Sequence, residues 1–331
     1  MSSSAVSEDA DTGPLATIPV ICGPTASGKS AIAMWLSQRR EIVLINADSR
    51  QIYRGFDLGT AKPSHDDRAR VPHRGVDVVD PTDRYSAAQW SALAEGAIRE
   101  AFAAGRSPVI VGGTGFYISA LFRPLWTQPP LDQERRSALQ TSLGELPTEE
   151  LRRWCVALDP ARAHLGRAQL LRALEVTLLT GTPLTELHVA HARPPAFRAS
   201  YLLVDPGVEL PARIAARAAA MLDAGWPDEV RRLIDAVPAN APAWNATGYE
   251  IMRRHVLGGG GGEGELDRGA ALDRVVIETR QYAKRQRTWF RHQLEHDRVQ
   301  RLVTDAPGWQ ETVDRWITEL ETMRMSAEHA R

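Results

Sequence analysis

Short runs of apolar, mostly β-branched residues alternate along the chain with longer segments whose apolar positions recur every three or four residues. The longer segments predict helices, such as residues 86–104 and 209–224, each followed by a glycine that can end it. The short runs predict buried strands at residues 17–22, 41–47, 76–79, 108–111 and 201–204. This alternation is typical of an α/β fold in which helices cover both faces of a parallel sheet.

The strand pattern disappears between residues 123 and 198, where arginine-rich helical segments replace it. A glycine-rich run at residues 258–264 predicts a flexible surface loop. The expected parts of the chain are a disordered N-terminus at 1–14, an α/β core at 15–122 and 199–318, a mainly helical insertion domain at 123–198 and a C-terminal tail at 319–331.

A glycine-rich motif stands between the first predicted strand and the helix predicted at residues 31–37. It reads GPTASGKS and matches the phosphate-loop pattern G-x-x-x-x-G-K-[ST] in the strand, loop, helix order that this pattern requires. Backbone N–H groups of such a loop cradle a di- or triphosphate, and the serine hydroxyl can bind Mg²⁺. The expected core is therefore P-loop NTPase-like, typical of nucleotide-binding and ATP-binding proteins. The predicted diphosphate-binding residues are Gly23, Pro24, Thr25, Ala26, Ser27, Gly28, Lys29 and Ser30, with Ser30 as the metal ligand.

Lysine is scarce in this chain. Only Lys29, Lys62 and Lys284 occur among 40 basic residues, and each stands in a local sequence that looks like a site. A compact ammonium is not replaced by the planar fork of arginine. We therefore expect Lys284 to join Lys29 at the diphosphate pocket.

The overall composition narrows the setting. With 331 residues and 43% hydrophobic content, the chain can bury a large core. Its net charge of −1 gives no global nucleic-acid signature, so a nucleic acid would have to meet a local basic surface. Cys22 and Cys155 show no metal or redox spacing, the N-terminus lacks a signal-peptide pattern, and no apolar run is long enough to span a membrane. We expect a cytoplasmic protein with no membrane partner.

Two strand ends place polar side chains near the phosphate loop. The second predicted strand runs into INADSRQIYRG, so Asp48 and Ser49 come at the carboxyl edge of the sheet, where ligands of parallel sheets bind. The strand at 108–111 runs into GGTGFY, where the glycines leave the hydroxyl of Thr114 accessible to the same cleft. On local pattern alone, Asp48 could instead cap the next helix and Thr114 could be an ordinary turn residue.

The motifs occur in an order that resembles one family. GPTASGKS, INADSRQIYRGFDLGTAKP, VPHR, YSAAQW, VGGTGFYISAL, LLRALEV, ATGYE and TRQYAKRQRTWFR follow one another as in bacterial tRNA dimethylallyltransferases, also called tRNA isopentenyltransferases. The resemblance implies transfer of a dimethylallyl group from dimethylallyl diphosphate to the N6 amine of the adenosine 3′ of the anticodon, with release of diphosphate. It also implies that the phosphate loop holds the prenyl diphosphate together with Mg²⁺ and does not act as an ATPase.

The roles of single residues follow from this resemblance and from the chemistry. Asp48 looks like the base that accepts the amine proton, with Thr114 orienting the same amine. Lys29 and the loop amides would stabilise the leaving diphosphate. Arg213 and Arg217 lie one helical turn apart on RIAAR and can face the diphosphate together, and the resemblance favours Arg217.

The tRNA anticodon stem-loop is the implied partner, and we expect the protein to act as a monomer. Residues 280, 284, 287 and 291 repeat at helical spacing and form a basic stripe, while Tyr282 and Trp289 lie off this stripe and are expected to be core anchors. The predicted tRNA-binding residues are Asp48, Ser49, Arg50, Gln51, Thr114, Arg136, Gln169, Arg172, Gly248, Tyr249, Arg287 and Arg291.

The chain departs from the family pattern in two places. The segment AHLGRAQLLRALEV is about four residues shorter than in relatives, and Arg74 stands where a second histidine is usual. Three other classes remain open on sequence alone: a small-molecule P-loop kinase, an adenylate prenyltransferase that makes a free cytokinin, and a noncatalytic RNA-binding module. The missing acidic residue after the strand at 108–111 disfavours a kinase, and the arginine-rich insertion favours tRNA over AMP.

Overall fold

The computed structural model describes residues 15–123, 125–126, 131–190, 192–258, 266–304 and 306–329. The chain divides into two compact units, Met1–Phe122 with Ala196–Arg331, and Arg123–Pro195. The predicted disordered N-terminus and almost all of the glycine-rich run lie outside the described residues. The insertion ends at residue 195 rather than 198, because Phe197 is buried and packs under the guanidinium of Arg99 in the core unit.

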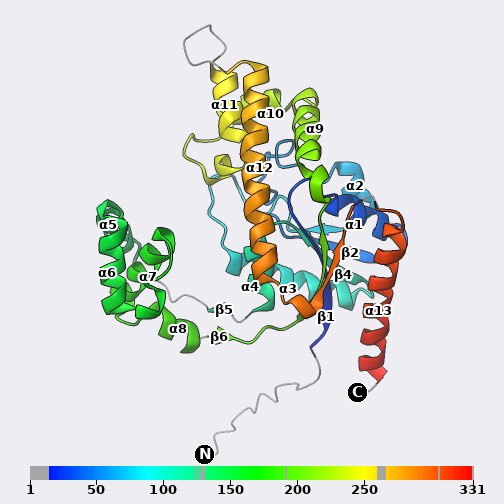
Figure 1. The fold of residues 1–331 in the computed structure, drawn as a ribbon, viewed down its shortest axis with the longest axis horizontal. Helices are drawn as coiled ribbons and strands as arrows, with labels where there is room; N and C mark the ends of the chain where they lie inside the picture. Colours follow the sequence, from blue (N-terminus) through cyan, green and yellow to red (C-terminus); the bar gives the residue numbers. More distant parts are fainter. Residues whose placement is uncertain are drawn as a thin grey trace, which may run out of the picture. The chain divides into compact units, whose positions relative to one another are not determined.

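The core unit is built on a six-stranded sheet in the order β3-β2-β4-β1-β7-β8. Figure 1 labels β1, β2 and β4 of this sheet, with helices packed around it. Every neighbouring pair of strands runs parallel, as the sequence pattern predicts. The strands are β1 (Thr17–Cys22), β2 (Ile42–Asn46), β3 (His73–Arg74), β4 (Ser107–Gly112), β7 (Arg198–Val204) and β8 (Val299–Leu302). Because β1 lies in the middle, the phosphate loop that follows it opens at the centre of the carboxyl edge.

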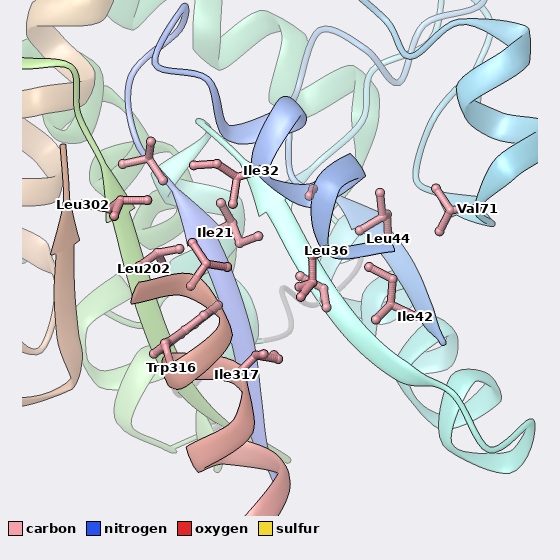
Figure 2. Close-up of a cluster of buried hydrophobic side chains, with 14 residues drawn as sticks. Ile21, Ile32, Leu36, Ile42, Leu44, Val71, Leu202, Leu302, Trp316 and Ile317 are labelled. Atoms are coloured by element: carbon pink, nitrogen blue, oxygen red, sulfur yellow. The ribbon is translucent and has the colours of Figure 1, made fainter. Parts of the chain in front are cut away.

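Helices cover both faces of this sheet. Ile32 and Leu36 of α1 pack with Trp316 and Ile317 of α13 against Ile21 and other strand residues (Figure 2). On the opposite face, the indole of Trp90 donates a 2.8 Å hydrogen bond to the carbonyl of Asn46 and stacks on Tyr117. The helices of the core unit are α1 (Lys29–Ser37), α2 (His65–Arg70), α3 (Ala87–Ala103), α4 (Gly115–Phe122), α9 (Leu210–Asp223), α10 (Trp226–Ala236), α11 (Tyr249–Leu257), α12 (Arg268–Gln293) and α13 (Trp309–His329), with short 3-10 turns at Gly207–Glu209, Pro242–Asn245 and His296–Arg298.

Two predicted elements differ from the structure. The strand expected at 76–79 is absent: a two-residue strand precedes it, and the backbone takes a left-handed turn at Gly75 and at Asp77, which interrupts an extended run. Val79 keeps only an isolated bridge to Tyr53. Of the tail expected at 319–331, the described residues 319–329 are instead the second half of α13, where the guanidinium of Arg324 lies over the ring of Phe102.

The second unit is mainly helical, as predicted, and has its own core. Leu151, Leu170, Leu174 and Leu184 are buried together with Cys155. No described helix of either unit has the length and apolar composition needed to cross a membrane. The elements are β5 (Leu125–Trp126), α5 (Gln133–Glu145), α6 (Thr148–Leu158), a 3-10 turn (Pro160–Arg162), α7 (Arg167–Thr180), α8 (Leu184–Ala190) and β6 (Ala192–Arg193).

Candidate active site

The phosphate loop joins β1 directly to the first turn of α1. Gly28, which caps the helix, has a φ of 94°, a left-handed conformation that glycine adopts without strain. A Cβ at Gly23 would lie 2.1 Å from the carbonyl oxygen of Val204, so no other residue fits where this loop leaves the sheet. After β8, the hydroxyl of Thr304 donates a 2.5 Å hydrogen bond to the carbonyl of Ser27 and fixes the middle of the loop.

The side chain of Lys29 lies against the inside of its own loop. Its Nζ donates to the carbonyl of Pro24 at 2.6 Å and contacts the hydroxyl of Ser27 at 3.3 Å. Burial and the nearby Arg217 lower the pKa of Lys29 to about 8, while Asp48 acts in the opposite direction. A cation that is costly to bury gains most from an anionic ligand, so this position favours a phosphate group.

Asp48 and Thr114 come together from the ends of two neighbouring strands. Asp48 follows β2, and its Oδ1 accepts a 2.9 Å hydrogen bond from the backbone N–H of Arg50. Thr114 follows β4, and its hydroxyl accepts a 3.0 Å hydrogen bond from the N–H of Ser49. The N–H of Thr114 donates in turn to the carbonyl of Ala47 at 3.0 Å. These bonds hold a carboxylate and a hydroxyl on adjoining loops, the arrangement that general-base chemistry on a small polar group needs.

A cavity of about 620 Å³ connects Asp48 with the phosphate loop. It is lined by the loop residues from Thr25 to Ala31 and also by Asp48, Gln51 and Arg217. A smaller adjoining cavity of about 60 Å³ shares Asp48 and Arg217 with the first and adds Arg50 and Tyr282. Asp48 therefore stands where a ligand on the phosphate loop and a second ligand in the adjoining cavity would meet.

Two arginines of α9 complete the positive side of the cavity. Arg213 and Arg217 both line it, as their spacing on RIAAR predicts. Burial lowers the pKa of the Arg217 guanidinium, and Asp48 opposes this shift. Arg213 lies beside Gly28, since a Cβ on that glycine would be 3.7 Å from its guanidinium. Together with Lys29 they form a cationic wall suited to a di- or triphosphate.

The comparisons with known proteins agree with this geometry. Residues 51–293 match the family model described as IPP transferase. The chain belongs to the IPP transferase family. A tRNA dimethylallyltransferase of Deinococcus radiodurans is 40% identical over 285 residues, which cover 84% of this chain and 90% of that relative. A protein of the same name from Thermus thermophilus is 40% identical over 280 residues, covering 83% and 90%.

Solved structures extend the likeness to three dimensions. The tRNA delta(2)-isopentenylpyrophosphate transferase of Staphylococcus epidermidis superposes with a TM-score of 0.65 at 26% identity, over 93% of this chain and 99% of that one. A eukaryotic dimethylallyltransferase acting on tRNA superposes with a TM-score of 0.78 at 23% identity, over 94% of this chain and 80% of that one. At that identity the eukaryotic match supports the fold alone.

In this IPP transferase, the helix α12 contributes two further residues to the cavity region, Tyr282 and Gln286. The phenol of Tyr282, expected to be a core anchor, also forms a hydrogen bond with the side chain of Thr114 and lines the smaller cavity. The amide of Gln286 accepts from the N–H of Thr25 and donates to the carbonyl of Gly113, at 2.8 Å each. Their spacing of four residues, on one face of α12, is the signal that could have revealed them.

Of the three lysines, Lys29 and Lys62 line the large cavity. Lys62 is a buried anchor, since its side chain is 2% exposed and its ammonium bonds Asp57 Oδ1 at 2.6 Å, Asp77 Oδ1 at 2.5 Å and the carbonyl of Tyr53. Lys284 is exposed and is not among the residues lining the cavity. Helix periodicity explains this, because position 284 lies on the side of α12 away from Gln286.

Several residues predicted to bind tRNA have structural partners. Tyr249 is fully buried, and its hydroxyl donates to the carboxylate of Glu229 at 2.6 Å. Gly248 is buried as well, and its N–H donates to Glu278. Gln51 lines the large cavity but uses its amide to bond the carbonyls of Thr60 and Ala61. Both Gly248 and Tyr249 are buried and bonded within the protein in this structure, and their contact with tRNA stays a prediction.

The basic stripe on α12 is also partly occupied. Arg287 forms an ion pair with Asp205 and donates a 2.6 Å hydrogen bond to the carbonyl of Gly207. Arg291 is exposed and borders a shallow cavity of about 480 Å³ that Arg287 and Arg301 also line. Of the two predicted contacts on the stripe, Arg291 is therefore the one open to a phosphate.

In the helical unit, the predicted tRNA-binding arginines converge on a buried carboxylate. Arg136 donates to Oε1 of Glu175 at 2.9 Å, and Arg172 bonds the same oxygen. Gln140 donates to Oε2 at 2.6 Å. Both arginine side chains keep about a third of their surface exposed, at 31% and 33%. Gln169 is exposed near the start of α7. Glu175 thus orders the two arginines and offsets part of their charge.

The donor set suits a magnesium ion that arrives with a phosphate ligand. Ser30 lines the large cavity and is exposed, as the metal role requires. No group of three or more His, Cys, Asp or Glu side chains that could hold a metal occurs among the described residues. Mg²⁺ commonly takes one or two protein ligands and completes its shell with water and phosphate oxygens, so this sparse set fits it.

Proposed function

We propose that this protein transfers a dimethylallyl group from dimethylallyl diphosphate to the N6 amine of the adenosine 3′ of the anticodon in tRNA. One observation carries the proposal: the carboxylate of Asp48 lines both the cavity of the phosphate loop and the smaller adjoining cavity. A diphosphate on the loop and a base in the adjoining cavity would meet at this residue. The names of the related proteins support a prenyl group as the transferred group and tRNA as the acceptor.

Leaving-group stabilisation is the main task of the phosphate loop. When N6 attacks the first carbon of the allyl group, the bond from that carbon to oxygen breaks and its electron pair leaves on diphosphate. Lys29, Arg217 and the loop N–H groups offset the charge that develops there. Magnesium, held by Ser30 and the phosphate oxygens, would neutralise further negative charge on the diphosphate.

Proton removal is the task on the amine side. An exocyclic amine is a poor nucleophile because its lone pair is delocalised into the ring, so it must lose a proton as the new bond forms. Asp48 is placed to accept this proton. Thr114 is held by Ser49 and Tyr282 and can orient the same amine by a hydrogen bond.

The setting of the reaction follows from the same residues. All the groups named above belong to one chain, so we propose that the protein acts as a monomer. Both cysteines are buried and unpaired, which suits a reducing compartment, and we place the activity in the cytoplasm. Arg291 of the core unit and Arg136 and Arg172 of the helical unit are the proposed contacts to tRNA phosphates.

Incubation of the protein with unmodified tRNA, dimethylallyl diphosphate and Mg²⁺ tests this function. Mass analysis of the anticodon-loop nucleosides should show one adenosine that carries a dimethylallyl group. Inorganic diphosphate should compete with the prenyl donor, and no ATP should be consumed. Transfer to free AMP instead of tRNA would make the protein an adenylate prenyltransferase, and stoichiometric ATP turnover would make it a kinase.

A further inference from the structure

One face of α12 lies along the loop that carries Thr114. The phenol of Tyr282 bonds Thr114, and one turn later the amide of Gln286 donates to the carbonyl of Gly113. A further turn along, the ring of Trp289 lies on Gly115, where a Cβ would be 2.2 Å from a ring carbon. Three successive turns of one rigid helix therefore contact three successive residues of the loop.

Unlike Tyr282, Gln286 also forms a hydrogen bond with the phosphate loop. Its Oε1 accepts the N–H of Thr25 while its Nε2 donates to Gly113. These partners lie 261 and 173 residues away in sequence. The side chain is 6% exposed, so water does not substitute freely for either bond. A Cβ at Gly113 would lie 2.4 Å from Nε2, so glycine is required there for the amide to approach.

We propose that Gln286 is a positioning residue that sets the phosphate loop against the Thr114 loop, and thereby fixes the separation between the leaving diphosphate and the attacking amine. This inference rests on the proposed function. Reacting atoms must be held about 3–3.5 Å apart, and an error of about 1 Å can cost about 10²-fold in rate. One amide that accepts from one loop and donates to the other meets this need, since neither loop can shift without loss of a buried hydrogen bond.

Two substitutions separate the two functions of the amide. Gln286→Met keeps the length of the side chain and removes both hydrogen bonds. Gln286→Glu keeps the acceptor for Thr25 but sets a carboxylate oxygen against the carbonyl of Gly113. The matched controls are Gln281→Met and Gln281→Glu, because Gln281 stands on the same helix and is exposed. Thermal unfolding and the folded fraction are measured for all four variants, and rates are given per folded molecule.

We expect kcat of both Gln286 variants at saturating tRNA and donor to fall by about 10²-fold. KM for tRNA should stay within about twofold of the wild-type value. The substitutions leave unchanged the contacts that the enzyme makes equally with tRNA in the ground state and in the transition state. The Gln281 variants should match the wild type. A role in stability alone would lower the folded fraction and leave kcat per folded molecule unchanged, which would overturn the proposal.

The pH dependence of Gln286→Glu gives an independent test. A protonated carboxyl can donate to Gly113 and accept from Thr25, as the amide does, whereas a carboxylate cannot donate. The ratio of variant to wild-type kcat should therefore rise as pH falls, and the ratio for Gln286→Met should stay flat. The proposed role of Gln286 would be overturned if the kcat ratios of both Gln286 variants were independent of pH. It would also be overturned if the Gln286 and Gln281 variants had equal rates while the wild type was active. No product from the wild type would instead count against the proposed function.

Discussion

Arg287 of α12 is bonded to Asp205 at two points. Its Nε donates to Oδ2 at 2.8 Å, and a second guanidinium nitrogen bonds Oδ1. Asp205 comes directly after β7, so the pair fastens the long helix to the sheet beside the phosphate loop. A guanidinium held in this way is part of the scaffold, although it lies on the same stripe as Arg291.

Replacement of these two arginines should have different effects. Arg287→Ala should lower stability by about 1–2 kcal/mol, because Asp205 loses its partner. Arg291→Ala should leave the melting temperature unchanged, raise KM for tRNA and reduce the salt slope of tRNA binding by about one unit. Calorimetry and binding at several salt concentrations measure these effects. Equal salt slopes for wild type and Arg291→Ala would exclude Arg291 from the tRNA contact.

Asp48→Asn should slow the transfer of the prenyl group without loss of binding of either substrate. The amide has the same shape but cannot accept the amine proton, so we expect kcat to fall by roughly 10²- to 10⁴-fold. Binding of inorganic diphosphate and of tRNA should remain near wild type. Single-turnover rates measure the chemical step, and a rate within about twofold of wild type would rule out Asp48 as the base.

Lys29→Arg should abolish donor binding although it keeps the charge. The ammonium contacts the carbonyl of Pro24 at 2.6 Å inside the loop, and a planar guanidinium has no room in that position. Lys284→Arg is the control, because that side chain is exposed and should tolerate the change. Calorimetric titration with inorganic diphosphate decides between them. Loss of diphosphate binding in Lys284→Arg would support the prediction, made from the scarcity of lysine, that Lys284 joins Lys29 at the diphosphate pocket.

The affinity for diphosphate should depend on the charge of Lys29. Because burial and Arg217 lower its pKa to about 8, the ammonium is present below this pH and is lost above it. Diphosphate stabilises the charged form, so the dissociation constant should increase by up to roughly tenfold per pH unit above 8. Lys29→Ala is the control, because any change of its dissociation constant with pH comes from the titration of diphosphate itself. Parallel pH profiles for the two proteins would show that Lys29 does not titrate in this range.

Removal of Glu175 should loosen the helical unit. Its carboxylate is buried and accepts from Arg136, Arg172 and Gln140, so its loss removes three hydrogen bonds, two of which link α5 to α7. Because both arginines are partly exposed to water, we expect Glu175→Ala to destabilise this unit by about 1–3 kcal/mol. Hydrogen exchange within α5–α7 should quicken while exchange in β1 stays slow. Unchanged exchange in α5–α7 would show that the cluster adds no stability.

The sequence predicts the buried strands well and the edge strands poorly. β1, β2, β4 and β7 are continuous apolar runs buried on both faces, and their patterns specify them. β3 has two residues and β8 is partly exposed, so neither carries such a pattern. Helices with clear caps, such as α3 after Ser86, were predicted to within one residue.

The candidate site was predictable where a motif encodes backbone geometry. The phosphate loop and the strand-end residues Asp48 and Thr114 follow from local order. Gln286 could not be inferred in this way, because its role depends on two loops that are remote in sequence. Lys62 lines the large cavity too, but its ammonium is held in a buried ion pair with two aspartates, so residue scarcity alone does not separate a ligand contact from a structural one.

The central place of β1 has a consequence for synthesis on the ribosome. One edge of β1 pairs with β4, which is made early, but the other pairs with β7, which begins at Arg198, after the whole helical unit. Chains grow at roughly 5–20 residues per second, so this apolar edge waits about 10–40 seconds for its partner. An unpaired hydrophobic edge invites pairing with other nascent chains. Slow codons between residues 123 and 195 should therefore reduce the yield of native enzyme without any change in its final stability.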